Sequence, residues 1–254
     1  MRNSPTLAFS RRRFLASAAA LPILAFHSSA MARSISGALP WEPLAGEPPA
    51  PVNPLGWKFF TPEEAATIEA IVTRFIPADD LSPNGKDAGC AVFIDRQLAG
   101  SYGAGSRLYM EGPFRPGLPT QGYQGSLTPA GRYREALRAL NDYVRKQNGN
   151  KNFVQLSGEE QDAVLKGMEE GHIDLKLAGG LNTKAFFELL LQNTMEGFFA
   201  DPVYGGNRDM VSWKMLGFPG ARYDYRDFID KHNQPYPLGP VGIVSGSADW
   251  ASKG

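Results

Sequence analysis

Residues 185–199 read AFFELLLQNTMEGFF, and the expected architecture follows from this segment. On a helix, its apolar side chains fall on nearly every side instead of on a single stripe. A helix of this kind is stable in water only when other elements surround it. We therefore expect a central buried helix that begins at Thr183 and is covered by shorter amphipathic helices.

Two sequence motifs mark where covering helices begin. Thr61-Pro-Glu-Glu64 and Ser157-Gly-Glu-Glu160 each combine an N-cap hydroxyl with a glutamate three residues later, which is a capping box. Apolar residues follow both motifs at helical spacing. Further helices are predicted over residues 88–99 and from Thr128 to about Asn148.

The segments between these helices are long and irregular. Residues 100–125 and 201–254 are rich in glycine, proline and aromatic residues, and residues 37–56 hold six prolines. Such a proline-rich segment is expected to run extended, as a linker or as an arm lying on a surface. The fold class is therefore mainly α, a small helical scaffold with long irregular loops and an extended N-terminal arm.

The N-terminus has the pattern of a twin-arginine (Tat) export signal. Arg11 and Arg12 form the arginine pair, and Phe14 and Leu15 follow it. The apolar stretch over residues 14–26 is too short to cross a bilayer as a helix but has the length of a signal h-region. A buried N-terminal helix or an uncleaved membrane anchor is the alternative interpretation.

A small-residue cleavage pattern closes this signal. Ala30-Met31-Ala32 predicts a mature start near Arg33. The predicted organisation is then a signal peptide over 1–32, a proline-rich arm over 33–56 and one helical domain over 57–254.

The charge balance argues against a nucleic-acid-binding protein. The chain carries 26 basic and 26 acidic residues. Removal of residues 1–32 takes away four arginines and no acidic residue, which leaves 22 basic and 26 acidic side chains. A mildly acidic protein is not expected to bind nucleic acid or anionic lipid strongly.

No motif assigns a catalytic, cofactor or metal site to this chain. Its single cysteine, Cys90, excludes an internal disulfide, a cysteine-rich zinc site, an iron–sulfur cluster and c-type haem attachment. Burial as an unreactive thiol is favoured for Cys90, and a disulfide with a partner is the alternative. His172 and His232 are candidate general bases with a carboxylate nearby. A histidine at the C-terminal end of a helix, where the helix dipole favours it, explains them as well. The run from Asp79 to Gly85 partly matches a calcium loop but lacks the final glutamate, so a turn is favoured.

Aromatic residues in the loop after residue 200 suit a protein–protein contact, where aromatic and arginine side chains supply anchors. Packing within the chain is the alternative. The candidate interface residues are Tyr204, Asn207, Arg208, Trp213, Phe218 and Tyr223.

Five segments together resemble the gluconate 2-dehydrogenase subunit 3 family. They are residues 60–65 (FTPEEA), 76–80 (IPADD), 88–98 (AGCAVFIDRQL), 201–207 (DPVYGGN) and 213–220 (WKMLGFPG). The resemblance implies an accessory small subunit of a membrane-associated, periplasmic dehydrogenase complex. In such complexes a large glucose–methanol–choline-type flavoprotein holds FAD and the catalytic residues, and a multihaem cytochrome c often passes electrons to the quinone pool.

The same resemblance implies what this chain contributes. It would supply the export signal, stabilise the flavoprotein and travel with it through the Tat translocase as one folded complex. Gluconate oxidation to 2-ketogluconate is the default reaction, although the resemblance does not identify the sugar. The alternatives from other classes are a free-standing periplasmic carbohydrate-binding module and a hydrolase that uses His172 or His232.

Overall fold

The computed structural model describes residues 50–222 and 225–244, and in these residues the regular structure is helical. They contain six α-helices, several single 3₁₀ turns and no strand, apart from one isolated parallel bridge between Gly220 and Val241. The mainly α fold class is thus confirmed. The predicted signal peptide, with Arg11, Arg12, Phe14 and Leu15, lies outside the described residues.

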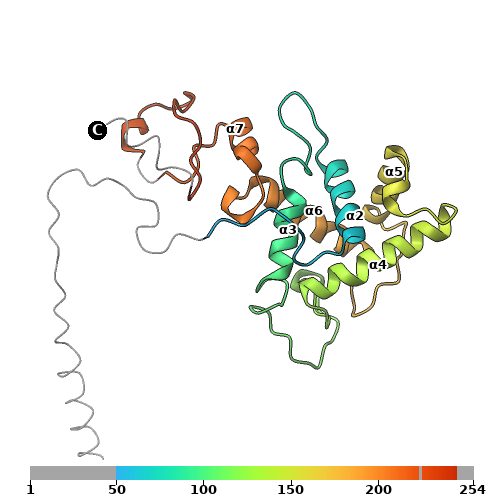
Figure 1. Cartoon of the computed structure of the whole chain (residues 1–254). Helices are drawn as coiled ribbons and strands as arrows, with labels where there is room; N and C mark the ends of the chain where they lie inside the picture. Colours follow the sequence, from blue (N-terminus) through green and yellow to red (C-terminus); the bar gives the residue numbers. More distant parts are fainter. Residues whose placement is uncertain (1–49, 223–224, 245–254) are drawn as a thin grey trace, which may run out of the picture. The chain divides into compact units, whose positions relative to one another are not determined.

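One helix contacts every other α-helix of the described chain. Figure 1 labels it among α2, α3, α4 and α5. This helix is α6, and its Phe186 and Leu190 are completely buried. The predicted central helix is therefore confirmed. The α-helices are α2 (Pro62–Phe75), α3 (Cys90–Ala99), α4 (Pro129–Gln147), α5 (Gly158–Glu169), α6 (Thr183–Phe199) and α7 (Val211–Leu216).

Both predicted capping boxes are formed. At the start of α2, the Thr61 hydroxyl accepts from the Glu64 N–H at 3.3 Å, and the Glu64 carboxylate accepts from the Thr61 N–H at 2.8 Å. At the start of α5, Ser157 and Glu160 make the same pair of bonds at 3.2 and 2.7 Å. Each box supplies acceptors for two backbone N–H groups that would otherwise lack a partner at the start of the helix. The position of each helix start is therefore determined by residues close together in the sequence.

The short helix α7 is the element that the sequence did not predict. It lies within the segment expected to be irregular and is only six residues long. Met210 before it and Gly217 after it both adopt left-handed backbone conformations. A helix this short shows too few apolar repeats for a periodic signal, so only its packing against α6 reveals it.

Within the described residues, no helix combines the length and the apolar character needed to cross a membrane.

Candidate functional site

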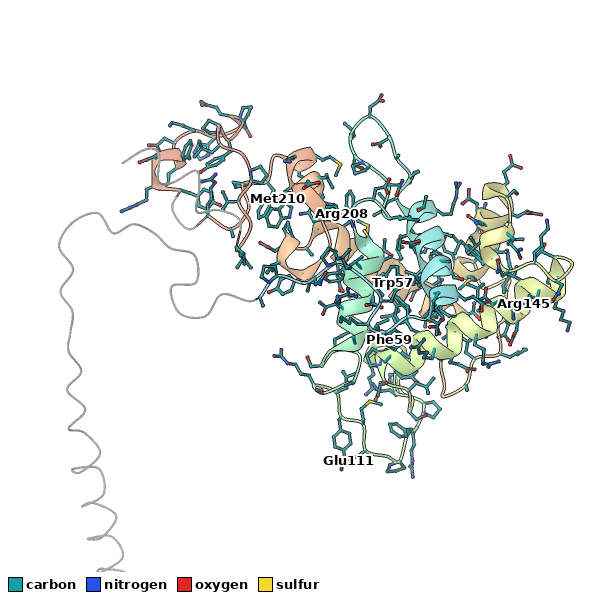
Figure 2. All side chains as sticks on the ribbon, in the orientation of Figure 1. Trp57, Phe59, Glu111, Arg145, Arg208 and Met210 are labelled. Atoms are coloured by element: carbon teal, nitrogen blue, oxygen red, sulfur yellow. The ribbon has the colours of Figure 1, made fainter. Side chains whose placement is uncertain are left out.

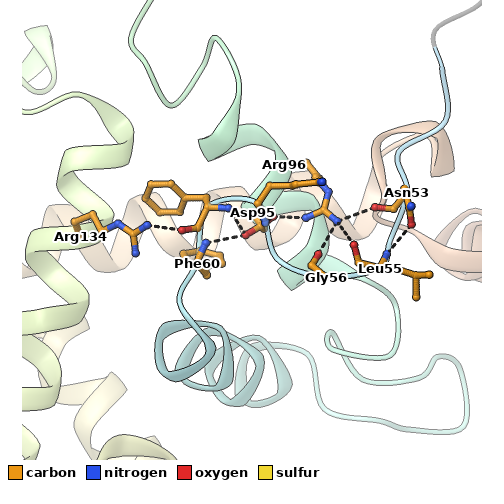
Figure 3. Close-up of polar contacts among 9 residues, drawn as sticks. Asn53, Leu55, Gly56, Phe60, Asp95, Arg96 and Arg134 are labelled. Atoms are coloured by element: carbon orange, nitrogen blue, oxygen red, sulfur yellow. Dashed lines mark hydrogen bonds and ion pairs between the residues drawn. The ribbon is translucent and has the colours of Figure 1, made fainter.

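The segment over residues 53–60, named the strap here, precedes α2 in the sequence and is bound by side chains of α3 and α4. Asp95 on α3 is fully buried, and its carboxylate accepts three backbone N–H groups of the strap (Figure 3). The bonds come from Lys58 at 2.8 Å, Phe59 at 3.0 Å and Phe60 at 2.9 Å. A carboxylate that accepts several N–H bonds replaces the water it loses on burial, so this contact binds the strap to α3.

The neighbouring Arg96 binds the earlier half of the strap. Its guanidinium pairs with Asp95 and donates to the carbonyls of Asn53 at 2.7 Å, Leu55 at 3.3 Å and Gly56 at 2.8 Å (Figure 3). The Arg96 side chain is only 9% exposed. Residues 53–56, which the sequence assigns to the proline-rich arm, are thus bound directly to a helix of the domain.

A third charged side chain reaches the strap from α4. Arg134 pairs with Glu64, the capping residue of α2, and donates to the Phe59 carbonyl. Its guanidinium also stacks on the Phe59 ring, 4.0 Å from the ring centroid. The strap therefore joins α2, α3 and α4.

The segment over residues 201–207 (DPVYGGN) binds the end of α6 and the start of α7. Asn207 has a left-handed backbone (φ 43°) and is fully buried. Its amide donates to the Ala200 carbonyl at 2.9 Å and accepts from the Ser212 N–H and hydroxyl at 3.0 and 2.8 Å. A Cβ on Gly206 would lie 2.1 Å from the Gly197 carbonyl of α6, so only glycine permits this close approach.

Two of the candidate interface residues therefore have internal roles. Asn207 is buried as described, and Trp213 is 6% exposed and donates its indole N–H to the Phe199 carbonyl at 3.0 Å. Both residues thus pack within the chain, which is the alternative that the sequence left open, because polar and aromatic residues in a loop can also hold that loop against its own domain. Phe218 packs edge-on against Trp213 yet remains 46% exposed.

The other candidates divide between exposed and undescribed positions. Tyr204 is 42% exposed, and Arg208 is also exposed. With Phe218, they form what is here called the α7-side surface. Arg208 and Met210 are labelled beside the α7 region in Figure 2. Tyr223 lies outside the described residues.

A second exposed surface lies in the loop after α3. None of the candidate interface residues belongs to this loop. Its most exposed apolar side chains are Tyr109 (82%) and Leu118 (66%). Figure 2 shows Glu111 at the tip of this loop, away from the helices. The sequence indicated the loop over 100–125 by its glycine, proline and aromatic content, with Tyr109 and Phe114 among the aromatics, and favoured it as a segment that lies on the flavoprotein. The candidate interface residues, however, all lie after residue 200.

The two surfaces lie at opposite ends of α3. Arg208 N–H bonds the Ala88 carbonyl just before α3, at 2.9 Å, whereas Gly103 N–H bonds the Gln97 carbonyl near its end, at 3.1 Å. A ten-residue helix is about 15 Å long. A partner that contacts both surfaces must therefore extend along α3.

The histidines singled out by sequence lie on the surface. The His172 side chain is 76% exposed, with Nδ1 3.1 Å from a carboxylate oxygen of Glu170, and His232 is exposed. Neither lines the groove described below. Among the described residues, no group of three or more His, Cys, Asp or Glu side chains is placed to hold a metal ion.

The calcium-loop pattern folds as a pair of side-chain turns. Asp79 accepts from the N–H groups of Leu81 and Ser82 at 2.8 and 2.9 Å, and Asn84 accepts from the Asp87 N–H at 2.9 Å. These bonds are typical of Asp and Asn in turns, so the turn interpretation is confirmed.

Cys90 is fully buried at the first position of α3, and burial raises the pKa of its thiol to about 12. Because the thiolate is the reactive form, we expect Cys90 to resist a thiol reagent at pH 8 in the native chain and to react stoichiometrically after unfolding. Measuring thiol release with and without denaturant checks this. Rapid modification of the native chain would instead support an accessible thiol that a partner's cysteine could reach.

Comparison with known families bears on the whole helical region. The family model described as gluconate 2-dehydrogenase subunit 3 matches residues 62–220, more than half of the 254-residue chain. The chain belongs to the gluconate 2-dehydrogenase subunit 3 family. As a subunit 3 chain it is part of a gluconate dehydrogenase complex and associates with other subunits of that complex. Comparisons with curated proteins and with solved structures gave no significant match.

The subunit 3 match coincides with the architecture described above. It begins at Pro62, the first residue of α2, and ends at Gly220, beyond α7. It therefore includes Asp95, Arg96, Asn207 and both exposed surfaces, whereas the strap directly precedes it.

Proposed function

We propose that this chain is the accessory, non-catalytic subunit of a periplasmic, membrane-associated, FAD-dependent sugar or sugar-acid dehydrogenase. The observation that carries the proposal is the subunit 3 match over residues 62–220. The large glucose–methanol–choline-type partner would hold FAD and the catalytic residues, and a multihaem cytochrome c would accept the electrons. Gluconate oxidation to 2-ketogluconate is the default reaction.

The roles of the charged side chains support a scaffold. Asp95, Arg96 and Arg134 bind the strap to three helices, and Asp201 accepts from Val203 N–H at 2.9 Å and Ile243 N–H at 2.7 Å. These groups position the chain's own segments. The exposed apolar side chains of the α7-side surface and of the loop after α3 are then available for contact with another subunit.

The N-terminal pattern supports co-export. Arg11, Arg12, Phe14 and Leu15 match a Tat signal, and the Tat route carries proteins that are already folded. A flavoprotein loaded with FAD in the cytoplasm could therefore cross the membrane bound to this chain.

The test is co-expression of the large subunit with the full chain, without it, and with the double variant Arg11→Lys/Arg12→Lys. We expect periplasmic dehydrogenase activity with the unaltered chain, but neither without the chain nor with the double variant, because the double variant lacks the arginine pair that the translocase reads. Arg2→Lys, outside the pair, is the matched control and should export normally. Equal export, flavin content and activity in all four cases would defeat the proposal.

A further inference from the structure

A groove of about 810 Å³ opens beside the loop that follows α3. One wall comes from residues 114–118 and 122–126 of this loop. The other comes from Gly179, Gly180 and Asn182 and from α6 residues between Ala185 and Gln192. Arg132 of α4 also lines it. The Tyr123 hydroxyl donates to the Gly179 carbonyl at 2.6 Å, so a direct bond joins the two walls.

Arg132 is a half-buried cation in this groove. Its Nε donates to the Leu127 carbonyl at 3.2 Å, and its guanidinium stacks on the Tyr123 ring at 3.9 Å from the centroid. Burial lowers the pKa of Arg132, which shows that the charged form loses water there. Within the described part of the chain, no carboxylate pairs with it.

The helix arginines away from the groove differ from Arg132. Arg74 pairs with Asp162, Arg138 with Glu135 and Asp142, and Arg145 with Glu63.

The groove holds a second arginine, Arg115, that has no ion pair among the described residues, and one carboxylate, Glu188. Its net charge is therefore positive, although the chain after residue 32 is acidic overall.

The edge of the groove is apolar. Phe114 is 42% exposed and Leu118 is 66% exposed, and both line the groove. Leu108 (47%) and Tyr109 (82%) extend the apolar character along the same loop. A single sugar or sugar acid is too small to cover all four side chains, whereas a polypeptide segment can cover them.

We propose that this groove and the adjoining apolar loop bind a segment of the large subunit that carries a carboxylate flanked by apolar side chains. The carboxylate pairs with the free N–H groups of Arg132, whose stacked, planar guanidinium is already positioned for a two-bond contact. The flanking apolar side chains cover Phe114 and Leu118. This inference rests on the proposed function and names the face of the chain that performs it.

The test uses the full chain co-expressed with a tagged large subunit, and the apparent Kd of the purified complex is measured by mass photometry. Arg132→Gln and Leu118→Asp should each weaken the complex about tenfold or more. The matched controls are Arg138→Gln, on the same helix but outside the groove, and Leu81→Asp, 72% exposed on another loop. Both controls should bind like the unaltered chain.

Salt dependence separates an ion pair from a structural role. The unaltered complex should weaken as salt rises, and Arg132→Gln should show a smaller slope because one charge contact is missing. Arg132→Lys keeps the charge and should bind with intermediate affinity. Thermal denaturation of each variant shows whether the fold is retained, and a Leu118→Asp chain that folds normally but binds weakly supports the inference without reference to Arg132.

Each other outcome is decisive. If the unaltered chain does not bind the large subunit, the proposed function and this inference both fail. If the complex forms and the groove variants bind like their controls, only this inference fails. The inference is also overturned if free gluconate or glutamate raises the melting temperature in an Arg132-dependent way, or if the chain alone forms dimers that Leu118→Asp separates.

Discussion

Replacing Asp95 by alanine should lower the free energy of unfolding by about 3–5 kcal/mol. The substitution removes the acceptor of three strap N–H groups and leaves the nearly buried Arg96 without its counter-ion. An uncompensated buried cation and unbonded N–H groups are both costly. In a domain of this size the melting temperature should fall by about 10 °C, which circular dichroism can measure.

An exposed aspartate in the segment between α2 and α3 provides the control for this prediction. Asp80 is exposed and has no side-chain partner among the described residues. Asp80→Ala should therefore change stability by less than about 0.5 kcal/mol. Asp95→Asn keeps the shape but replaces one acceptor oxygen by a donor, so it should also be destabilising. An Asp95→Ala chain as stable as Asp80→Ala would show that the strap contributes nothing to the fold.

Replacing Asn207 by alanine should destabilise the chain by about 3–4 kcal/mol. It leaves the Ala200 carbonyl and the two Ser212 donors without their partner inside the protein. The left-handed backbone at this position adds a cost of about 1 kcal/mol for alanine. Thermal denaturation, or hydrogen exchange at α7 within the complex, measures the loss.

Asn233 separates the two causes of this loss. It also has a left-handed backbone (φ 56°), but it is exposed and makes no side-chain hydrogen bond in the described structure. Asn233→Ala should therefore show the backbone cost alone. If Asn207→Ala left stability unchanged and weakened only the complex, the residue would be a partner contact after all, as the sequence first suggested.

The parts of the fold that sequence predicts well are those determined by neighbouring residues. Thr61 and Glu64 are three residues apart, so their capping box is visible without knowledge of the rest of the chain. The all-round apolar character of residues 185–199 likewise states that this helix is surrounded, although not by which helices. Both interpretations are confirmed by the structure.

The contacts that sequence reasoning missed join distant residues. Asp95 binds N–H groups 35 to 37 residues earlier, and a charged pair within an amphipathic helix looks like part of its exposed face. Arg132 lines the groove only because the fold brings α4, the start of α6 and the loop after α3 together, and the sequence does not show this proximity. At Asn207 a local signal existed, since Gly-Gly-Asn favours left-handed backbone and tight packing.

The strap also determines how the molecule responds to a mechanical load. Tension applied to the chain at residue 50 is carried first by the hydrogen bond from Val52 N–H to the Val203 carbonyl, at 2.9 Å. It then reaches the carbonyl contacts of Arg96 and the three N–H bonds of Asp95, before the apolar core is strained. The carboxylate on α3 is thus a force-bearing attachment that resists unravelling from the N-terminal side, whatever pulls on the chain.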